Sequence, residues 1–184
     1  AGALLDFGDL AAQSPAFLDA FGTSVGIDQD YIYVGATGRD NGAGRVGSVS
    51  IFKPAFIIGY DFVDEYFPLA PATVGGHCGA SLQVDRVQPG FILGCPDSDT
   101  VYYAGEGTAR VYRPFEFLGS PVWLESLLTY GGQLHGADAL GTSVAINGDQ
   151  AFAGAPKAHF SGQSNNGAFK EFVHDGIFRN GFDG

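Results

Sequence analysis

One short pattern occurs three times along the chain, and it limits the fold more than any other feature of the sequence. The copies lie at residues 21–27, 78–84 and 140–146, and each has Gly at its second position and Ser at its fourth. Such self-similarity is the signature of repeat architectures, in which each copy is one supersecondary unit that buries its apolar face against its neighbours. The chain is therefore expected to fold as three stacked units.

Two further landmarks follow each copy in a constant register. The second landmark has Gly at its centre, and the third begins with Gly and ends with an aromatic residue. The second spans residues 34–36, 93–95 and 153–155, and the third spans residues 47–52, 107–112 and 167–172. These segments are short, rich in β-branched and aromatic residues and bounded by turn residues, which predicts strands. Asn147 and Gly148 suit a two-residue turn, so consecutive strands should form hairpins.

A fourth strand in each copy is expected ahead of its first glycine, and this completes the predicted all-β fold. These strands should lie around residues 4–10, 62–69 and 122–128. The whole chain, residues 1–184, then forms one domain of three four-stranded repeats. The repeats span about 4–52, 60–112 and 122–173, and a C-terminal tail follows at 174–184.

The two cysteines fit this register. Cys78 occupies the position that Phe21 has in the first copy, and Cys95 occupies the position of Ala36. In a hairpin these positions face each other across adjacent strands, which favours a disulfide inside the middle repeat. The alternative is a pair of buried free thiols.

Charge and composition exclude several classes of partner. The chain has 9 Lys and Arg against 20 Asp and Glu, for a net charge of −11. Such a chain has no basic surface for nucleic acid or for anionic lipid. No apolar run is long enough for a spanning helix, so we expect no membrane insertion. The chain has no Met and starts with Ala-Gly-Ala, which, with the cysteine pair, predicts a secreted protein whose signal peptide has been removed.

The landmarks resemble the FG-GAP repeat of bacterial secreted proteins and of integrin α-chain propellers. The resemblance rests on Phe-Gly-Thr-Ser-Val, on Ala-Gly-Ala-Pro and on Gly-Ser-Val followed by an aromatic residue, and it covers about residues 4–173. It is close in the first and third copies, whereas the middle copy departs at Cys78 and Cys95. The resemblance implies that each repeat is a four-stranded blade of a β-propeller, in an extracellular protein of the bacterial surface that binds ligands, cells or matrix.

The calcium loop of integrin-type repeats is not expected here. Such a loop needs several oxygen ligands in one long turn, but the turns at residues 28–30 and 147–149 are short and the turn at 85–90 has one carboxylate. Asp97 and Asp99 are the only weak metal candidates, and a solvated acidic loop is the alternative. No cofactor is expected.

Three blades do not close a propeller, since propellers have four to eight. The sequence therefore predicts that the incomplete blades are completed by homo-oligomerisation or strand exchange, in a ring or a filament. Residues 1–18 form an apolar extension that could act as an exchanged strand. The candidate assembly residues are Leu4, Leu5, Phe7, Phe17, Ile177, Phe178 and Phe182. A closed barrel of three pseudo-symmetric units is the alternative architecture.

The sequence contains motifs that imitate active sites. Residues 22–26 satisfy the G-x-S-x-G pattern, but Ser24 recurs in each copy inside a predicted strand, which favours a packing role. Trp123 could stack on a sugar, although blade packing is the alternative.

The function predicted is a non-catalytic structural protein that self-assembles outside the cell, into a fibril or a ring. The alternative is an adhesion module that binds a surface ligand or a glycan.

Overall fold

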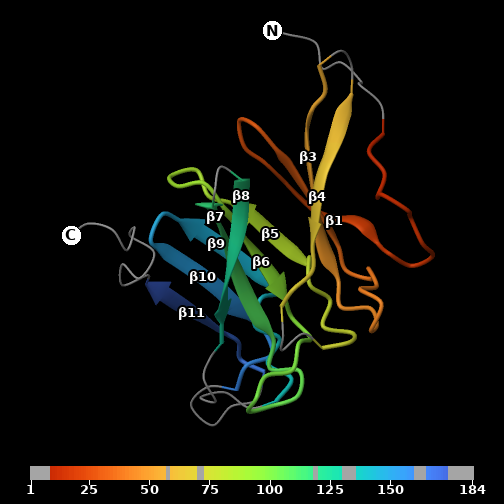
Figure 1. Cartoon of the computed structure of the whole chain (residues 1–184). Coiled ribbons are helices and arrows are strands. Elements are labelled where there is room, and N and C mark those ends of the chain that lie inside the picture. The colour runs from red at the N-terminus through yellow and green to blue at the C-terminus, as the bar shows by residue number, and fades with distance from the viewer. Residues whose placement is uncertain are drawn as a thin grey trace, which may run out of the picture.

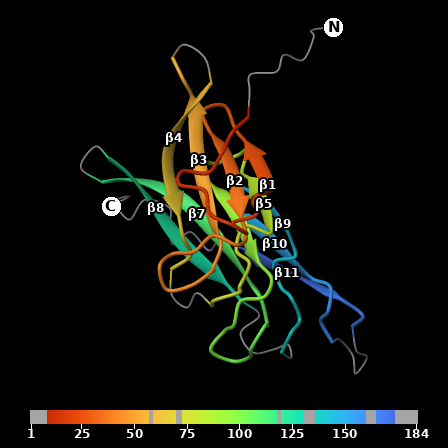
Figure 2. The same cartoon turned by 90° about the vertical axis from the view of Figure 1, so that its right-hand side faces the viewer.

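The computed structural model describes residues 9–56, 59–69, 73–117, 120–129, 136–159 and 165–173. These residues form eleven strands and no helix. All pairings between the strands are antiparallel, and the strands make three separate sheets that lie side by side in chain order (Figures 1 and 2). The all-β prediction with three blade-like repeats is confirmed.

Each sheet follows the order of its strands in the chain. The first contains β1 (Phe21–Ile27), β2 (Ile32–Ala36), β3 (Ser48–Pro54) and β4 (Tyr60–Tyr66). The second contains β5 (Ser81–Val84), β6 (Phe91–Cys95), β7 (Thr108–Phe117) and β8 (Ser120–Leu128). The third contains β9 (Ser143–Asn147), β10 (Gln150–Ala155) and β11 (Ala168–Val173). None of the three closes on itself, so the described residues do not form the closed barrel that was the alternative.

The predicted position of the fourth strand is wrong in the second and third repeats, and the strand predicted around residues 4–10 lies largely outside the described residues. The strands near 62–69 and 122–128 were expected at the start of the following repeats, whereas β4 pairs with β3 and β8 pairs with β7. The length of the connections explains which sheet β4 and β8 join, because short connections join antiparallel neighbours. Five residues separate β3 from β4 and two separate β7 from β8, but 14 separate β4 from β5 and β8 from β9. Each fourth strand therefore completes the sheet of the preceding repeat.

The hydrophobic core lies between consecutive sheets, in two clusters that share the middle sheet. Phe91 and Leu93 of β6 face the first sheet, where they pack with Tyr33. Ile92, between them in sequence, faces the third sheet and packs with Leu140. Side chains alternate across a strand, so β6 is buried on both faces and its sequence is an apolar run rather than an alternating one. The repeats are therefore held together by stacking.

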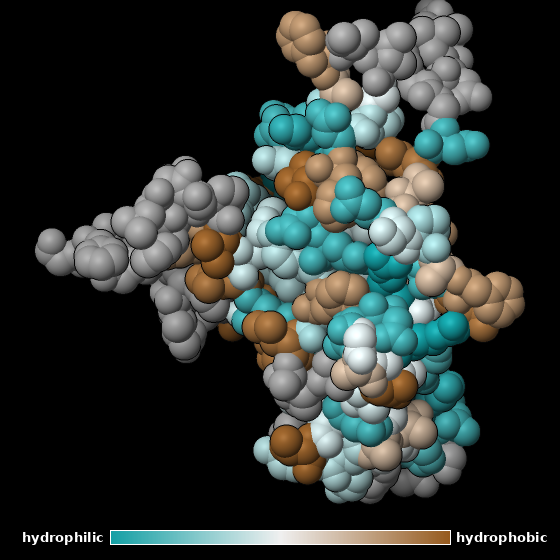
Figure 3. All heavy atoms as spheres, turned by 45° about the vertical axis from the view of Figure 1, so that its right-hand side comes forward, coloured by the Kyte–Doolittle hydropathy of each residue, from teal (hydrophilic) through white to brown (hydrophobic). Residues whose placement is uncertain are grey.

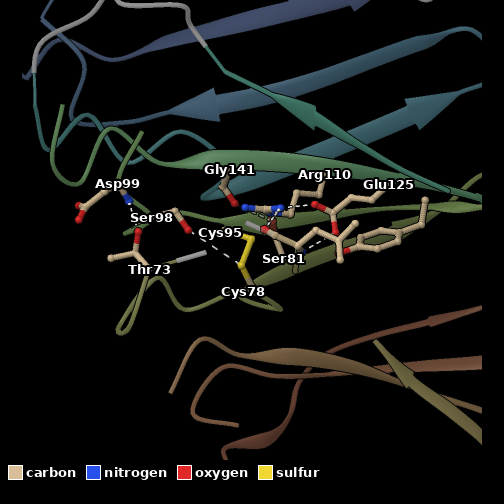
Figure 4. Close-up of a disulfide and its surroundings, with 11 residues drawn as sticks. Thr73, Cys78, Ser81, Cys95, Ser98, Asp99, Arg110, Glu125 and Gly141 are labelled. Carbon is tan, nitrogen blue, oxygen red and sulfur yellow. Dashed lines mark hydrogen bonds and ion pairs between the residues drawn. A yellow bond between two sulfur atoms is a disulfide. The ribbon is translucent and has the colours of Figure 1, made fainter. Parts of the chain in front are cut away.

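A disulfide joins Cys78 to Cys95, as predicted (Figure 4). Both residues are buried, and the bridge ties the segment before β5 to the last residue of β6. Cys78 also lies beside Ser98, which is fully buried. The bridge therefore closes the inner hairpin of the middle sheet.

Candidate assembly interface

Consecutive repeats meet through one backbone contact that occurs twice. Gly47 forms a parallel bridge with Cys78, and Gly107 forms the equivalent bridge with Leu140. The amides of Cys78 and Leu140 donate to the carbonyls that precede these glycines, at 3.0 and 2.9 Å. A Cβ atom on Gly47 would lie 2.1 Å from the Cys78 carbonyl oxygen, and one on Gly107 would lie 2.3 Å from that of Leu140. The third landmark begins with Gly because the next repeat lies against it.

The Ser that recurs in each copy of the first landmark is also explained by contact with the next repeat. The Ser24 hydroxyl donates to the Gly79 carbonyl at 2.7 Å, and the Ser81 hydroxyl donates to the Gly141 carbonyl at 2.8 Å. Figure 4 shows Ser81 and Gly141 facing each other beside the disulfide. Each hydroxyl therefore bonds the first glycine of the following repeat, so the G-x-S-x-G match at Ser24 reports packing between repeats.

Apolar side chains fill the space behind these hydrogen bonds. Val84, at the end of β5, is buried in the cluster that contains Val49 of the first sheet. Ile146, at the equivalent place in β9, is buried in the cluster that contains Ala109 of the second sheet. Burying a side chain of this size contributes about 1.5–3 kcal/mol relative to exposure. The innermost strands of the second and third repeats, β5 and β9, thus dock on the preceding sheet.

An ionic contact reinforces the second junction. The fully buried Asp85 carboxylate accepts from the Gly148 amide at 3.0 Å and pairs with Arg113 at 2.7 Å. Burial alone would raise the pKa of Asp85, but hydrogen bonds from the Val87 and Gly148 amides and from Arg113 outweigh it and lower this pKa below its ordinary value. Asp85 therefore joins the β5–β6 turn to the β9–β10 turn as a carboxylate.

Arg39 holds the described part of the N-terminal extension against the first sheet. Its guanidinium pairs with Asp19 and Glu65 at 2.9 Å each and donates to the Ser14 carbonyl at 2.9 Å. Residues 9–20 form no strand, and Phe17 is exposed. The other predicted assembly residues lie outside the described ones: Leu4, Leu5, Phe7, Ile177, Phe178 and Phe182.

The weak metal candidates have separate partners. Asp97 contacts the His77 Nδ1 atom at 2.7 Å, and the Asp99 carboxylate accepts from the Gly105 amide at 2.8 Å. In the part of the chain that the structure describes, no three His, Cys, Asp or Glu side chains gather where they could hold a metal ion.

Trp123, the ligand-stacking candidate, lies against the core between the first two sheets. Its ring centroid is 5.3 Å from that of Phe91, 6.0 Å from that of Tyr66 and 6.4 Å from that of Tyr33. The indole is half-buried in this aromatic cluster. These contacts are those of a side chain in blade packing.

The outer edge of the third sheet differs from the other two. In the first two sheets the third strand is covered by β4 or β8, whereas β11 pairs only with β10 among the described residues. On the molecular face in Figure 3, hydrophobic residues stand in small separate groups among hydrophilic ones. The candidate contact surface is therefore defined by equivalent positions of the repeats rather than by one large apolar patch.

The fold defines an all-β protein built from stacked blade-like sheets. Residues 6–52, which include β1, β2 and most of β3 of the first sheet, match the FG-GAP repeat family. The match ends at Phe52 in β3, the aromatic residue that closes the third landmark. A comparison with curated proteins found no match. No helix that could span a membrane occurs among the described residues.

Proposed function

We propose that this chain is a secreted, non-catalytic structural protein that assembles with copies of itself, into an extracellular fibre or ring. The observation that carries the proposal is that, among the described residues, β11 has no neighbour on the side where β3 has β4 and β7 has β8. An exposed strand edge presents unpaired amides and carbonyls and takes up a strand from another chain.

The spacing of the repeats supports the N-terminal residues as that strand. β4 ends at Tyr66, 13 residues before Gly79, and β8 ends at Leu128, 13 residues before Gly141. The same spacing before Gly22 ends at residue 9, directly after the apolar segment that contains Leu4, Leu5 and Phe7. Because each fourth strand completes the sheet of the preceding repeat, residues 1–8 of one copy would complete β11 of another.

The surroundings of the reactive residue types support a structural role rather than catalysis. The Ser24 hydroxyl bonds a backbone carbonyl of the next repeat, and the sulfur of Cys78, which follows His77, is in the disulfide. The thiolate that a Cys–His pair would use is therefore not available. The disulfide also supports an oxidising, extracytoplasmic location.

The proposal is tested by electron microscopy of the native protein and of a variant that lacks residues 1–8. This deletion keeps Ser14 and Asp19, which hold the extension through Arg39. We expect rings or fibres of the full chain and their loss in the variant, whereas Val101→Ser, a change of an exposed residue outside the N-terminal extension, should leave them intact. Uniform particles of one 19.2 kDa chain before deletion would contradict self-assembly, and unchanged particles after it would contradict strand exchange.

A second function is favoured by one exposed loop. Between β6 and β7 the side chains of Val101, Tyr102 and Tyr103 are exposed. Exposed tyrosines suit contact with a glycan or a surface ligand, because they combine an apolar ring with a hydrogen-bonding hydroxyl. Binding on a glycan array that is lost in Tyr102→Ala, with Tyr60→Ala as an exposed control, would support an adhesion module.

A further inference from the structure

The contact that joins consecutive repeats is left open at the end of the third repeat. Ser143 is the equivalent of Ser24 and Ser81, yet it is exposed, and none of the described residues accepts from its hydroxyl. A Cβ atom on Gly94 would meet the Gly141 carbonyl oxygen at 1.9 Å, whereas for one on the equivalent Gly154 the three nearest described atoms all belong to Ser143. The third repeat thus has the donor and the space for a further glycine carbonyl.

The glycine that begins the third landmark also lacks, in the third repeat, the neighbour that it has in the first two. Cβ atoms on Gly47 and Gly107 would collide with the backbone of the next repeat, at 2.1 and 2.3 Å. On the equivalent Gly167 the nearest atom would be the Pro156 oxygen of the same repeat, at 3.5 Å. No described residue therefore lies at the third repeat in the backbone position that a following repeat occupies at the first two junctions.

The first repeat has the complementary surface, and it is also open. A Cβ atom on Gly79 would lie 2.7 Å from the Ser48 carbonyl oxygen of the preceding repeat, and one on Gly141 would lie 2.2 Å from that of Thr108. On the equivalent Gly22 no described atom lies within 4 Å. The carbonyl of Gly22 is thus placed to accept a hydrogen bond like those that Gly79 and Gly141 accept.

Apolar side chains at the two ends of the stack of sheets are exposed where their equivalents inside the stack are buried. Ile27 is 66% exposed, whereas its equivalents Val84 and Ile146 are 6% and 5% exposed because the preceding sheet covers them. Phe169 is 72% exposed, whereas its equivalents Val49 and Ala109 are fully buried under the following repeat. Each end therefore exposes an apolar side chain at a position that is buried at the internal junctions.

We infer that the first sheet of one copy docks on the third sheet of a second copy, in the register that joins the repeats within the chain. The Ser143 hydroxyl of the second copy donates to the Gly22 carbonyl of the first copy, and Ile27 of the first copy covers Phe169 of the second. The inference rests on the proposed self-assembly and specifies its contact. A head-to-tail contact of this kind gives a closed ring or a filament. Two copies supply six repeats, within the four to eight blades of propellers, so a ring of two chains is expected.

The test uses one charged substitution at each end. Ile27→Lys changes the first sheet and Phe169→Lys changes the third, and both side chains are exposed, so each variant should keep its fold. The masses of the native chain, of each variant and of their equimolar mixture are measured by light scattering after size-exclusion chromatography. Circular dichroism and the melting temperature check the fold. Val101→Lys, a change of an exposed valine in the β6–β7 loop, is the matched control.

We expect the native chain and Val101→Lys to have the mass of two chains, and each end variant alone to have the mass of one. The mixture should recover the mass of two chains, because the native Ile27 of one variant can cover the native Phe169 of the other. Loss of assembly in only one of the end variants would indicate a head-to-head or tail-to-tail contact and overturn the inference. Larger masses of the native chain would overturn the two-chain ring.

Failure of this inference is distinguishable from failure of the proposed function. A native chain with the mass of one chain overturns both. Assembly that persists in Ile27→Lys and in Phe169→Lys overturns the docking register alone, and strand exchange through residues 1–8 would then account for the assembly.

Discussion

Gly94 gives the sharpest test of the packing between repeats. It lies in β6, and a Cβ atom there would be 1.9 Å from the Gly141 carbonyl oxygen and 2.2 Å from the Ser81 hydroxyl. The carbonyl belongs to the backbone of the third repeat and cannot turn aside. In Gly94→Ala the third repeat must shift and the Ser81–Gly141 hydrogen bond must break. Overpacking costs about 1–3 kcal/mol and a lost hydrogen bond about 1 kcal/mol, so the free energy of unfolding should fall by roughly 2–4 kcal/mol.

Gly154→Ala is the matched control, because Gly154 has the equivalent place in the third repeat. Its added methyl would meet only the end of the Ser143 side chain, which is exposed and can rotate. We expect a loss below about 1 kcal/mol, since no backbone must move. Urea unfolding followed by the fluorescence of Trp123, at a dilution where the chain is monomeric, measures both. Equal losses in the two variants would refute the reasoning.

Three further results are expected. Reduction of the disulfide between Cys78 and Cys95 should lower the free energy of unfolding by about 3 kcal/mol, measured by urea unfolding with and without a reductant. The folded-state pKa of Asp85 lies below the unfolded value of about 3.9. The contribution of the Asp85 carboxylate to the free energy of unfolding should therefore be complete above about pH 5 and be lost as the pH falls through the folded-state pKa. In Asp85→Asn the melting temperature should depend less on pH in this acid range. Ser81→Ala should cost about 1 kcal/mol of unfolding free energy, whereas Ser143→Ala should cost almost nothing in the monomer, and equal costs would contradict the assignment of the hydroxyl partners.

The repeat architecture and the disulfide could be predicted from the sequence because both depend on local pattern. Strand residues alternate with turn residues inside each repeat, so the register of Cys78 against Cys95 follows from counting along one hairpin. Which sheet β4 and β8 pair with could not be predicted from the pattern inside one repeat. Each lies between two repeats and has the composition to pair with either, and the shorter connection decides the pairing.

The contacts between repeats were beyond the reach of the sequence pattern for a different reason. The Ser and Gly positions mark the repeat, but the partner of Ser24 is 55 residues away and that of Ser81 is 60 residues away. No local periodicity links such pairs. The hydrogen bonds of Asp85 to Gly148 and its ion pair with Arg113 likewise required the stacked arrangement of the sheets. The signal that was present, a Ser repeated in all three copies, indicated packing without naming the partner.

The claim that this chain completes its stack of repeats with a second copy is tested most directly by sedimentation equilibrium of the native protein over a range of concentrations. We expect a mass of two chains, each of 19.2 kDa, with dissociation on dilution. A mass of one chain at every concentration would contradict it.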